Sequence, residues 1–290
     1  MRLSLYKAYF FTALSAVSLS SCTKEYETIE QIDERNIQAY IKQNALSGMQ
    51  PYGSTGVYYQ ILTPGKGTAM EYSEKVPLVF TFKSVDNSFS SNDTIVNHYG
   101  GFLGYFGLEG VRTGIKEVLI KRGGQIRLIV PSRSAYGRNG SGDIPGNTSI
   151  DVTVRALDIA GLPAYEDIMI SKYMQANNLT GFTRSSKGVY YKITSPGTGS
   201  SIAVDSTVTT NYTGKYLNGV VFDSATGFPS QLLYLVPAWQ QIIPLIKEGG
   251  SVRFITPSSQ AYGLHSSEKS QIIDFSPLDF DVTVTNVASN

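Results

Sequence analysis

The chain has 290 residues, which is long enough for two domains that each bury a core of their own. Hydrophobic residues make up 41% of it and charged residues 16%, a balance typical of folded globular proteins and not of disordered ones. The formal net charge is +1 and no basic cluster occurs along the sequence, which argues against nucleic acid as a partner. Nineteen tyrosines and 28 glycines favour a structure rich in strands and turns.

The first 22 residues have the pattern of an export signal. Arg2 and Lys7 precede the apolar run AYFFTALSAVSLS, which is too short to span a membrane. The run ends in LSSC (residues 19–22), and Cys22 is the only cysteine of the chain. This ending resembles the bacterial lipobox, whose cysteine is lipidated and becomes the mature N-terminus; a plain secretory signal with an incidental cysteine is the alternative. The resemblance implies a signal peptide over residues 1–21 and a lipid anchor at Cys22. It also implies a protein of the bacterial cell envelope that is held on a membrane with its domains in the periplasm or at the cell surface.

Beyond the signal, the chain repeats itself. GVYYQILTPGKG (56–67) matches GVYYKITSPGTG (188–199) at an offset of 132, and RLIVPSRSAYG (127–137) matches RFITPSSQAYG (253–263) at an offset of 126. The first copy therefore has six additional residues between the two strings, which we place near residues 84–107, here named the insert. A repeat of this length indicates two structural units of one fold.

A segment with helical spacing precedes each copy. Residues recur at i, i+3, i+4 and i+7 in both segments, as Ile37, Tyr40, Ile41 and Asn44 and again as Ile170, Tyr173, Met174 and Asn177. We expect both helices to dock on the domain that follows; binding of a partner protein is the alternative. The expected division is residues 22–49 for the anchor linker and helix, 50–160 for the first copy, 161–187 for the linker helix and 188–290 for the second copy.

Inside each copy the pattern is that of strands and turns. Val189, Tyr191 and Ile193 alternate with more polar positions, and TPGKG and SPGTG are turn sequences. In the second copy only AWQQIIPLIKEGG (238–250) is predicted to be helical, ending at a glycine pair, with Pro244 limiting it to a short or bent helix. We therefore predict an α+β fold in which each copy is mostly antiparallel sheet with one short helix.

Several kinds of chemistry are excluded by residue type. The two histidines, His98 and His265, occupy non-equivalent positions, so no repeated histidine-based acid/base or metal site is expected. The glycine-rich segment 137–146 lacks the Lys-Ser/Thr ending of a phosphate loop and is interpreted as a surface loop. We expect neither a metal nor a cofactor.

Aromatic residues gather in the second copy, where the simplest interpretation of them is core packing. The order of motifs there is YTG (212–214), GVVFDS (219–224), VPAW (236–239), GG (249–250), AYG (261–263) and SPLDFDV (276–282). This order resembles the FKBP type of peptidyl-prolyl cis-trans isomerase and covers roughly residues 188–288. The resemblance implies a twisted antiparallel sheet around a short helix, with an apolar pocket between them.

The resemblance also implies roles for individual residues. Trp239 would form the pocket floor, with Tyr262 donating a hydrogen bond from its hydroxyl to a substrate carbonyl and Asp223 as a polar group at the edge. The Val236 backbone N–H would donate a second hydrogen bond. The remaining implied contacts with substrate come from the walls and the rim: Tyr212, Phe222, Phe228 and Phe280 in the walls, and Leu235, Val236 and Ile272 at the rim. Proline-containing polypeptides are the implied partners, and the oligomeric state is left open.

Two departures from the family pattern stand near this set. The helix reads WQQIIPLIK where the family often has Trp-x-Glu-Gly, and Asp274-Phe275 replaces the usual Pro-Asn. Phe275 is expected to alter the mouth of the pocket and its sequence preference. Neither change removes a residue of the pocket wall.

The first copy keeps fewer of these residues. Phe80 corresponds to Tyr212, nothing in residues 84–95 reproduces Phe-Asp, and counting back from Gly123 places Thr113 at the position of Trp239. Tyr136 and IPGN (144–147) survive. We therefore expect a first copy of the same fold with a degraded pocket and a structural or partner-binding role. The second copy is expected to isomerise X-Pro bonds of exported proteins; the alternative is a lipoprotein whose two domains only bind polypeptides or serve as a scaffold.

Overall fold

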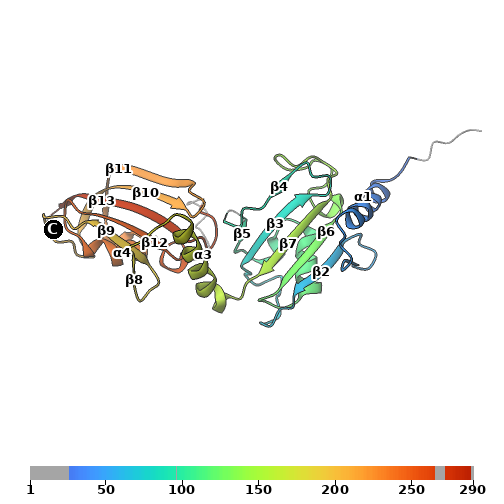
Figure 1. Ribbon diagram of the computed structural model, residues 1–290, viewed down its shortest axis with the longest axis horizontal. Helices are drawn as coiled ribbons and strands as arrows, with labels where there is room; N and C mark the ends of the chain where they lie inside the picture. Colours follow the sequence, from blue (N-terminus) through green and yellow to red (C-terminus); the bar gives the residue numbers. More distant parts are fainter. Residues whose placement is uncertain (1–25, 96, 265–271, 289–290) are drawn as a thin grey trace, which may run out of the picture.

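The computed structural model describes residues 26–95, 97–264 and 272–288, and it contains two antiparallel sheets, one in each copy (Figure 1). Helix α3 (Leu162–Ala176) lies between the two sheets, and α1 (Ile29–Gln43) lies at the outer end of the first copy. Cys22 and His265 fall outside the described residues. Within the described ranges, no helix combines the length and the apolar character that crossing a bilayer requires.

The first sheet has seven strands. Their order is β1-β2-β6-β7-β3-β4, and β5 pairs with β3 beside β4. Every pair in it is antiparallel: β1–β2, β3–β4 and β6–β7 join strands that follow each other in the chain, whereas β2–β6 and β7–β3 join strands far apart in the sequence. The strands are β1 (Gln50–Pro51), β2 (Tyr58–Thr63), β3 (Leu78–Ser84), β4 (Ser90–Ser91), β5 (His98–Tyr99), β6 (Gln125–Val130) and β7 (Ile150–Ala156).

The second sheet has six strands in the order β11-β10-β13-β12-β9-β8. Its edge strand β11 is 11 residues long, whereas the corresponding edge of the first sheet consists of the two-residue strands β4 and β5. The insert of the first copy therefore lies where the second copy has its long outer strand. The strands are β8 (Thr183–Arg184), β9 (Tyr190–Ser195), β10 (Thr207–Tyr216), β11 (Val221–Gln231), β12 (Ser251–Thr256) and β13 (Leu278–Ala288).

A short helix packs on each sheet. In the second copy α4 (Pro237–Ile242) continues as the 3-10 turn η6 (Ile243–Leu245), and in the first copy α2 (Glu109–Thr113) continues as the π-helical segment η2 (Gly114–Leu119). The sequence prediction of a helix over 238–250 was too long, because the backbone is already extended at Ile246. Pro244 lies in the last turn and offers no N–H to continue the helix. The remaining 3-10 turns are η1 (Leu103–Tyr105), η3 (Ser132–Ser134), η4 (Ile159–Gly161), η5 (Leu232–Tyr234) and η7 (Ser258–Gln260).

The two docking helices use the same buried contact. From α1, Asp33 accepts hydrogen bonds from the backbone N–H and the hydroxyl of Ser132, at 2.9 and 2.8 Å. From α3, Glu166 accepts the same pair from Ser258, at 2.8 and 2.5 Å. Both serines follow the proline of the repeated strings, so the repeat includes the place where each helix docks. Burial raises the pKa of Glu166 to about 7, because the carboxylate loses its hydration there.

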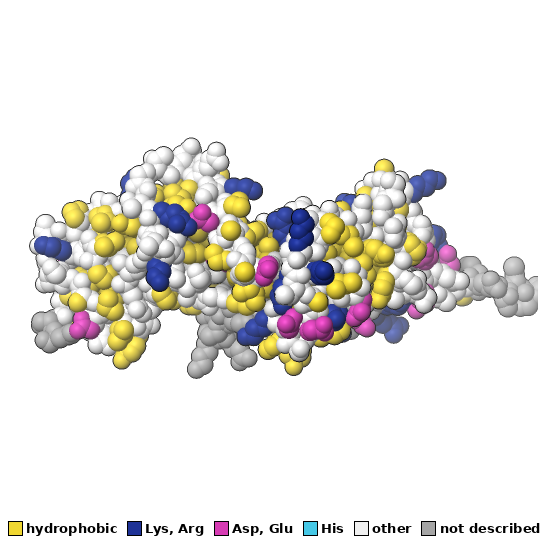
Figure 2. Space-filling view, turned by 90° about the horizontal axis from the view of Figure 1, so that it is seen from below, with side chains coloured by type: hydrophobic (Ala, Val, Ile, Leu, Met, Phe, Trp, Pro, Cys, Tyr) yellow, Lys and Arg dark blue, Asp and Glu magenta, His cyan; other side chains and the backbone are white. Residues whose placement is uncertain are grey.

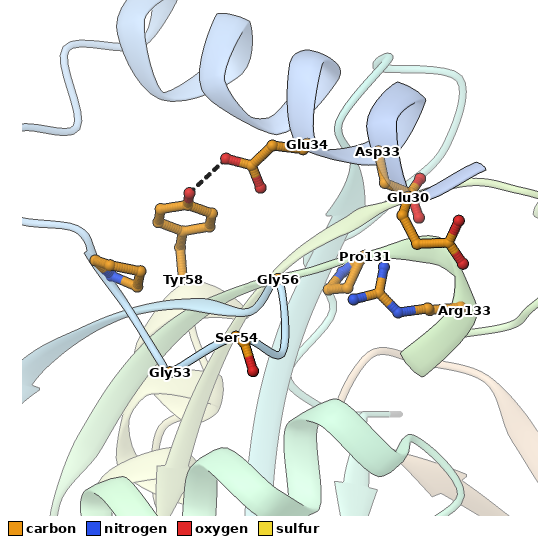
Figure 3. A pocket seen from close by; sticks show the side chains of 10 residues that line it. Glu30, Asp33, Glu34, Gly53, Ser54, Gly56, Tyr58, Pro131 and Arg133 are labelled. Carbon is orange, nitrogen blue, oxygen red and sulfur yellow. Dashed lines mark hydrogen bonds between the residues drawn. The ribbon is translucent and has the colours of Figure 1, made fainter. Parts of the chain in front are cut away.

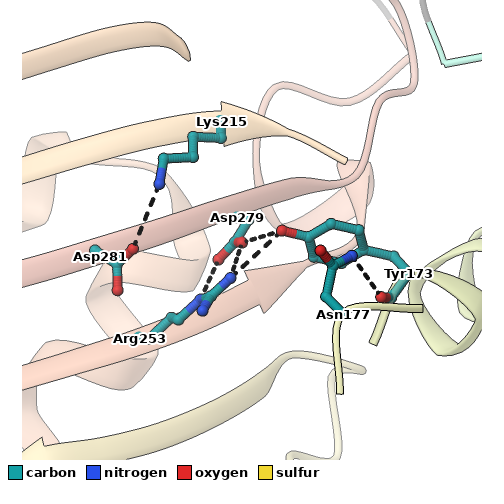
Figure 4. A network of polar contacts seen from close by, with 6 residues as sticks. All are labelled: Tyr173, Asn177, Lys215, Arg253, Asp279 and Asp281. Carbon is teal, nitrogen blue, oxygen red and sulfur yellow. Dashed lines mark hydrogen bonds and ion pairs between the residues drawn. The ribbon is translucent and has the colours of Figure 1, made fainter. Parts of the chain in front are cut away.

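A tyrosine, an aspartate and an arginine form a second repeated contact. Tyr173 of α3 donates to Asp279 at 2.7 Å, and Arg253 donates to both oxygens of that buried carboxylate, at 3.0 and 2.6 Å (Figure 4). In the first copy Tyr40, Asp151 and Arg127 make the same three-way contact. The arginine and the tyrosine together satisfy a carboxylate that burial would otherwise destabilise.

A third repeated contact lies at the edge of each docking helix. The Tyr58 hydroxyl donates to Glu34 of α1 at 2.6 Å, beside a hollow of about 270 Å³ that is lined by both charged and apolar residues (Figure 3). Tyr190 donates to Asp167 of α3 at 3.0 Å. The expected α+β architecture, with a helix docked before each sheet, is thus confirmed.

Candidate functional site

Five elements of the second copy bring aromatic rings together: β10, β11, α4, β12 and β13. Trp239 of α4 is 4% exposed and lies at the centre of the group. Its ring meets Tyr212 of β10 at 5.3 Å and Phe280 of β13 at 5.7 Å, in both cases nearly perpendicular. Edge-to-face contacts of this kind favour a fixed arrangement of rings over a loosely packed core.

The predicted wall residues from β11 join the same cluster. Phe228 meets Tyr212 at 5.7 Å, and Phe222 meets Phe280 at 5.7 Å. Gly214 of β10 gives these rings their space, because a Cβ there would lie 2.6 Å from Phe222 and 2.9 Å from Phe280. Glycine at this position therefore leaves the space that the rings of Phe222 and Phe280 occupy.

Sequence reasoning missed Phe254 as a member of the cluster. This residue of β12 is fully buried, stacks on Phe280 at 5.3 Å and meets Trp239 at 6.1 Å. The signal was present in the repeated string RFITP, where the first copy has Leu128. Phe254 supports Trp239 and Phe280 from behind and so fixes the position of both.

The predicted rim residues lie around the aromatic cluster. Ile272 is buried in the same apolar core, and Leu235 and Val236 are half-buried against it. Tyr262 also packs on this core, and burial together with the charge of Asp223 raises the pKa of its hydroxyl. Tyr262 therefore remains a protonated hydrogen-bond donor at neutral pH.

Asp223 is exposed and accepts a hydrogen bond of 2.7 Å from the Tyr212 hydroxyl. Burial, this hydrogen bond and the Asp223 charge together raise the pKa of Tyr212. Both tyrosines thus keep their protons, and the cluster offers donors and apolar surface instead of a titrating base. This chemistry suits a reaction that needs no proton transfer.

The first copy does not rebuild this cluster. The strand pairing places Phe80 opposite Val154 as it places Tyr212 opposite Val282, so Phe80 corresponds to Tyr212, as predicted from the sequence. By the same pairing Phe82 replaces Gly214 and Val152 replaces Phe280. A ring thus stands where the second copy leaves space, and a smaller side chain stands where it has a ring.

The sequence assignment of Thr113 to the Trp239 position was wrong. Buried residues follow the same spacing in both short helices: Gly110, Val111, Gly114 and Ile115 in the first copy, and Ala238, Trp239, Ile242 and Ile243 in the second. This pattern places Val111 opposite Trp239. Counting back from Gly123 failed because the π-helical segment adds two residues before that glycine. The first copy has no large ring at this position in either assignment.

Residues of the insert fill the space instead. Phe106 is buried and meets Phe80 at 5.7 Å and Tyr99 at 5.0 Å. Tyr136, the counterpart of Tyr262, lies 6.4 Å from Phe82. The surviving tyrosine of the first copy is therefore part of a packed aromatic core.

Other kinds of site find little support in the described ranges. They contain no group of three or more His, Cys, Asp or Glu side chains that could hold a metal ion. On the face shown in Figure 2, basic and acidic side chains are interspersed among apolar ones over both copies. That face, as far as it is described, lacks the basic stripe by which proteins follow nucleic acid.

Comparison with known proteins gives consistent results for the second copy. Residues 199–285 match the family described as FKBP-type peptidyl-prolyl cis-trans isomerase. A protein of Neisseria meningitidis serogroup B named probable FKBP-type peptidyl-prolyl cis-trans isomerase FkpA is 40% identical over 86 residues, which cover 28% of this chain and 32% of that protein. FKBP-type peptidyl-prolyl cis-trans isomerase FkpA of Escherichia coli K12 is 34% identical over 117 residues, which cover 38% of this chain and 40% of that protein.

A third relative is named outer membrane protein MIP and comes from Legionella longbeachae. It is 36% identical over 83 residues, which cover 27% of this chain and 36% of that protein. The chain thus spans less than half the length of each of these relatives. The family match includes the aromatic cluster from Tyr212 to Phe280. Residues 199–285 therefore form a domain of the FKBP-type peptidyl-prolyl cis-trans isomerase family.

Proposed function

We propose that this protein is a peptidyl-prolyl cis-trans isomerase of the bacterial cell envelope and that it acts on X-Pro bonds of exported proteins through its second copy. One observation carries the proposal: Trp239, Tyr212 and Phe280 meet edge to face in the second copy, with Tyr262 at their border. The family match over residues 199–285 supports it.

The physical case rests on the nature of the barrier. Rotation about an X-Pro bond is opposed by amide resonance, a barrier of about 18–20 kcal/mol, and needs no nucleophile and no proton shuttle. An apolar site withdraws water from the charge-separated planar amide and so disfavours it relative to the twisted form. Fixed donors hold the flanking carbonyls while the bond rotates. Tyr262, which keeps its proton, fits this requirement, whereas the Tyr212 proton is already donated to Asp223.

Each residue then has a role in the proposal. Trp239 is the floor under the proline ring, and the rings of Tyr212, Phe222, Phe228 and Phe280 are the walls. Leu235, Val236 and Ile272 form the rim. The Tyr262 hydroxyl and the Val236 N–H donate to substrate carbonyls, and Asp223 holds Tyr212 through its 2.7 Å hydrogen bond.

The proposal extends to the organisation of the chain. Residues 50–160 and 188–290 are tandem FKBP-like domains, preceded by the linker and helix of residues 22–49 and by the linker helix of residues 161–187. The first domain is non-catalytic, and its packed core of Phe80, Phe82 and Phe106 supports this assignment. Residues 1–21 are the signal peptide, and Cys22 carries the lipid that anchors the protein to a membrane. The outer-membrane name of the Legionella relative agrees with an envelope location.

The test is catalysed isomerisation of a short proline peptide by the chain from Cys22 to Asn290. Tyr262→Phe removes one donor and is expected to lower kcat/KM, by at most the roughly 10²–10³-fold lost when a preorganised oxyanion donor is removed. Tyr136→Phe makes the same change in the first copy and should leave the rate unchanged. Trp239→Ala should abolish catalysis, with circular dichroism as a check that the fold survives. A wild-type rate no higher than the uncatalysed rate would refute the proposal.

A further inference from the structure

The insert of the first copy touches Asp274 and Phe275 of the second copy. These two residues and the preceding Ile272 and Ile273 lie beside the proposed site and are here named the rim loop. We infer that the first copy is a positioning element that holds the rim loop and thereby shapes the mouth of the proposed proline site. This inference rests on the proposed function of the second copy. β5 lies on the side of the first copy that faces the second, where this contact forms (Figure 1).

Phe275 is held in a conformation that a bulky residue rarely adopts. Its φ is +38°, in the left-handed region, and its side chain is fully buried. The corresponding residue of the first copy is Asn147, with φ +57°, and asparagine tolerates this region far better than phenylalanine does. A strained residue persists only where its surroundings determine it, so the contacts that bury Phe275 are the ones that hold the loop.

Those contacts come largely from the first copy. The His98 ring stacks on the Phe275 ring with centroids 4.2 Å apart and planes 10° apart. Val79 and Leu157 of the first copy pack against Phe275 in one apolar cluster, together with Leu162 of α3. The second copy alone therefore does not complete the environment of its own rim loop.

Backbone contacts fix the loop on the insert. The Gly100 N–H donates to Asp274 Oδ2 at 2.8 Å, and His98 Nδ1 lies 3.2 Å from the Asp274 carbonyl oxygen. The approach at Gly100 leaves no space for a side chain, because a Cβ there would lie 2.3 Å from the Leu264 carbonyl oxygen. The same Cβ would lie 3.0 Å from the Asp274 Cβ, so the backbone of the insert at Gly100 lies directly against the rim loop.

The rim loop is in turn joined to the proposed site. The Phe275 N–H donates to the Gly263 carbonyl at 3.0 Å, directly after Tyr262. The Ile273 N–H donates to the Tyr216 hydroxyl oxygen at 3.1 Å, and the Tyr216 ring lies 5.2 Å from the Phe222 ring. Ile272 is itself a rim residue of the aromatic core. A displacement of the loop would therefore reach Tyr262 and the wall ring of Phe222.

Two glycines of the insert provide a matched pair of variants. Gly100→Ala introduces a methyl group 2.3 Å from the Leu264 carbonyl oxygen and 3.0 Å from the Asp274 Cβ, so the insert has to move away from the rim loop. Gly107→Ala makes the same change in the same segment, where a Cβ would meet nothing within 4 Å. Neither substitution touches a residue of the aromatic cluster. Any difference between them therefore reports on the contact.

Two measurements on the chain from Cys22 to Asn290 test the inference. In Gly100→Ala, hydrogen exchange at the Ile273 and Phe275 amides should become faster. Affinity for a short proline peptide, followed by fluorescence of Trp239, the only tryptophan, should fall about threefold to tenfold as a prearranged binding surface is lost. Gly107→Ala should match the wild type in both. His98→Ala should resemble Gly100→Ala, whereas His98→Phe, which keeps a ring on Phe275, should restore affinity.

The outcomes separate this inference from the proposed function. Unchanged exchange in Gly100→Ala, or faster exchange with unchanged peptide affinity, would overturn the positioning role. A wild type that binds the peptide and does not isomerise it would refute the proposed function alone, and a loss of affinity in Gly100→Ala would still support the positioning role. A wild type that binds no proline peptide would overturn both.

Discussion

The two copies share their scaffold and differ in their interior. Each docks its preceding helix through a buried carboxylate on a serine and through a tyrosine on an aspartate–arginine pair. Yet Val111 of the first copy occupies the position of Trp239, and Phe82 of the first copy occupies the position of Gly214. Polar contacts that fasten a helix are thus retained where the residues that would bind a ligand are not. Retention of a fold and retention of a site are separate matters.

The largest effect that tests this comparison is expected at the buried ion pairs. Arg253→Met and Arg127→Met leave Asp279 and Asp151, both buried, without their cation. Removing one partner of a buried pair costs about 3–5 kcal/mol. We expect Arg253→Met to lower the unfolding free energy of the second copy by that amount, measured by Trp239 fluorescence in urea. Arg127→Met should shift the circular dichroism transition of the first copy instead. Equal shifts of the Trp239 signal in both variants would show that the copies do not unfold separately.

The next effect concerns the contact between the copies and depends on pH. Burial lowers the pKa of His98 to about 4, from an ordinary 6.5, although the nearby carboxylates Asp274 and Asp93 favour its protonated form. Opening the contact restores the ordinary pKa, so the open form binds more protons between these values. The contact is therefore stable above about pH 6.5 and weakens as pH falls towards 4, by at most roughly 3 kcal/mol. Exchange at the Phe275 amide, corrected for its intrinsic rate, should be faster at pH 5 than at pH 7.5. His98→Phe should remove this difference, and a wild type without it would contradict the assignment.

A smaller effect is expected from a side chain at Gly214, where the second copy leaves space for two rings and the first copy has Phe82. Gly214→Ala forces Phe222 and Phe280 to move, and overpacking of this kind costs about 1–3 kcal/mol. Isomerisation should fall more than stability does, because the displaced rings are wall residues of the proposed site. Activity and the urea midpoint of the same preparation give both values. A variant with normal activity would remove Phe222 and Phe280 from the proposed wall.

The smallest effect concerns the docking of α3. Glu166 has a pKa of about 7 in the folded chain against an ordinary 4.5, so the folded form holds its proton more tightly. Stability from this group is complete below pH 4.5 and is lost as pH rises through 7. Glu166→Gln stays neutral and should reduce the loss of unfolding free energy between pH 6 and pH 8 by about 1 kcal/mol. The two Asp33 carboxylate oxygens together accept three hydrogen bonds. Asp33→Asn, the matched change in α1, replaces one of these oxygens by an NH2 donor and should destabilise at both pH values. An unaltered pH dependence in Glu166→Gln would contradict this account.

Much of the fold could be predicted from the sequence because its signals are local. Alternation around Tyr190, the turn sequences and the spacing of Ile37 and Tyr40 depend only on neighbouring residues, and they predicted the sheets and the docking helices. The end of the short helix was misjudged at Pro244, and the Trp239 counterpart was misassigned because a π-helical segment adds residues that no offset reveals.

The candidate site was predicted from the order of motifs in the second copy and not from local periodicity, and contacts between the two copies could not be predicted in this way. The motifs from Tyr212 to Phe280 pointed to the aromatic residues, and the structure brings these rings together; their catalytic roles remain predictions. Phe254 was missed because it lies in the repeated string RFITPSSQAYG but outside the motifs that carry the family resemblance. The contact of His98 with Phe275 was out of reach, because it joins residues of two separate units whose arrangement no local pattern encodes.

The short linker between β7 and α3 affects how strong the contact between the two copies has to be. Only five residues, 157–161, separate Ala156 from Leu162, and three of them form a 3-10 turn. Tethering this short keeps the His98 and Phe275 rings at an effective concentration in the millimolar range. A contact whose intrinsic dissociation constant is itself millimolar would then be closed about half of the time, and each tenfold gain in affinity would move that balance strongly. A weak interaction at the rim loop is therefore sufficient to keep the contact between the two copies closed for much of the time. A small change in its affinity is sufficient to open it.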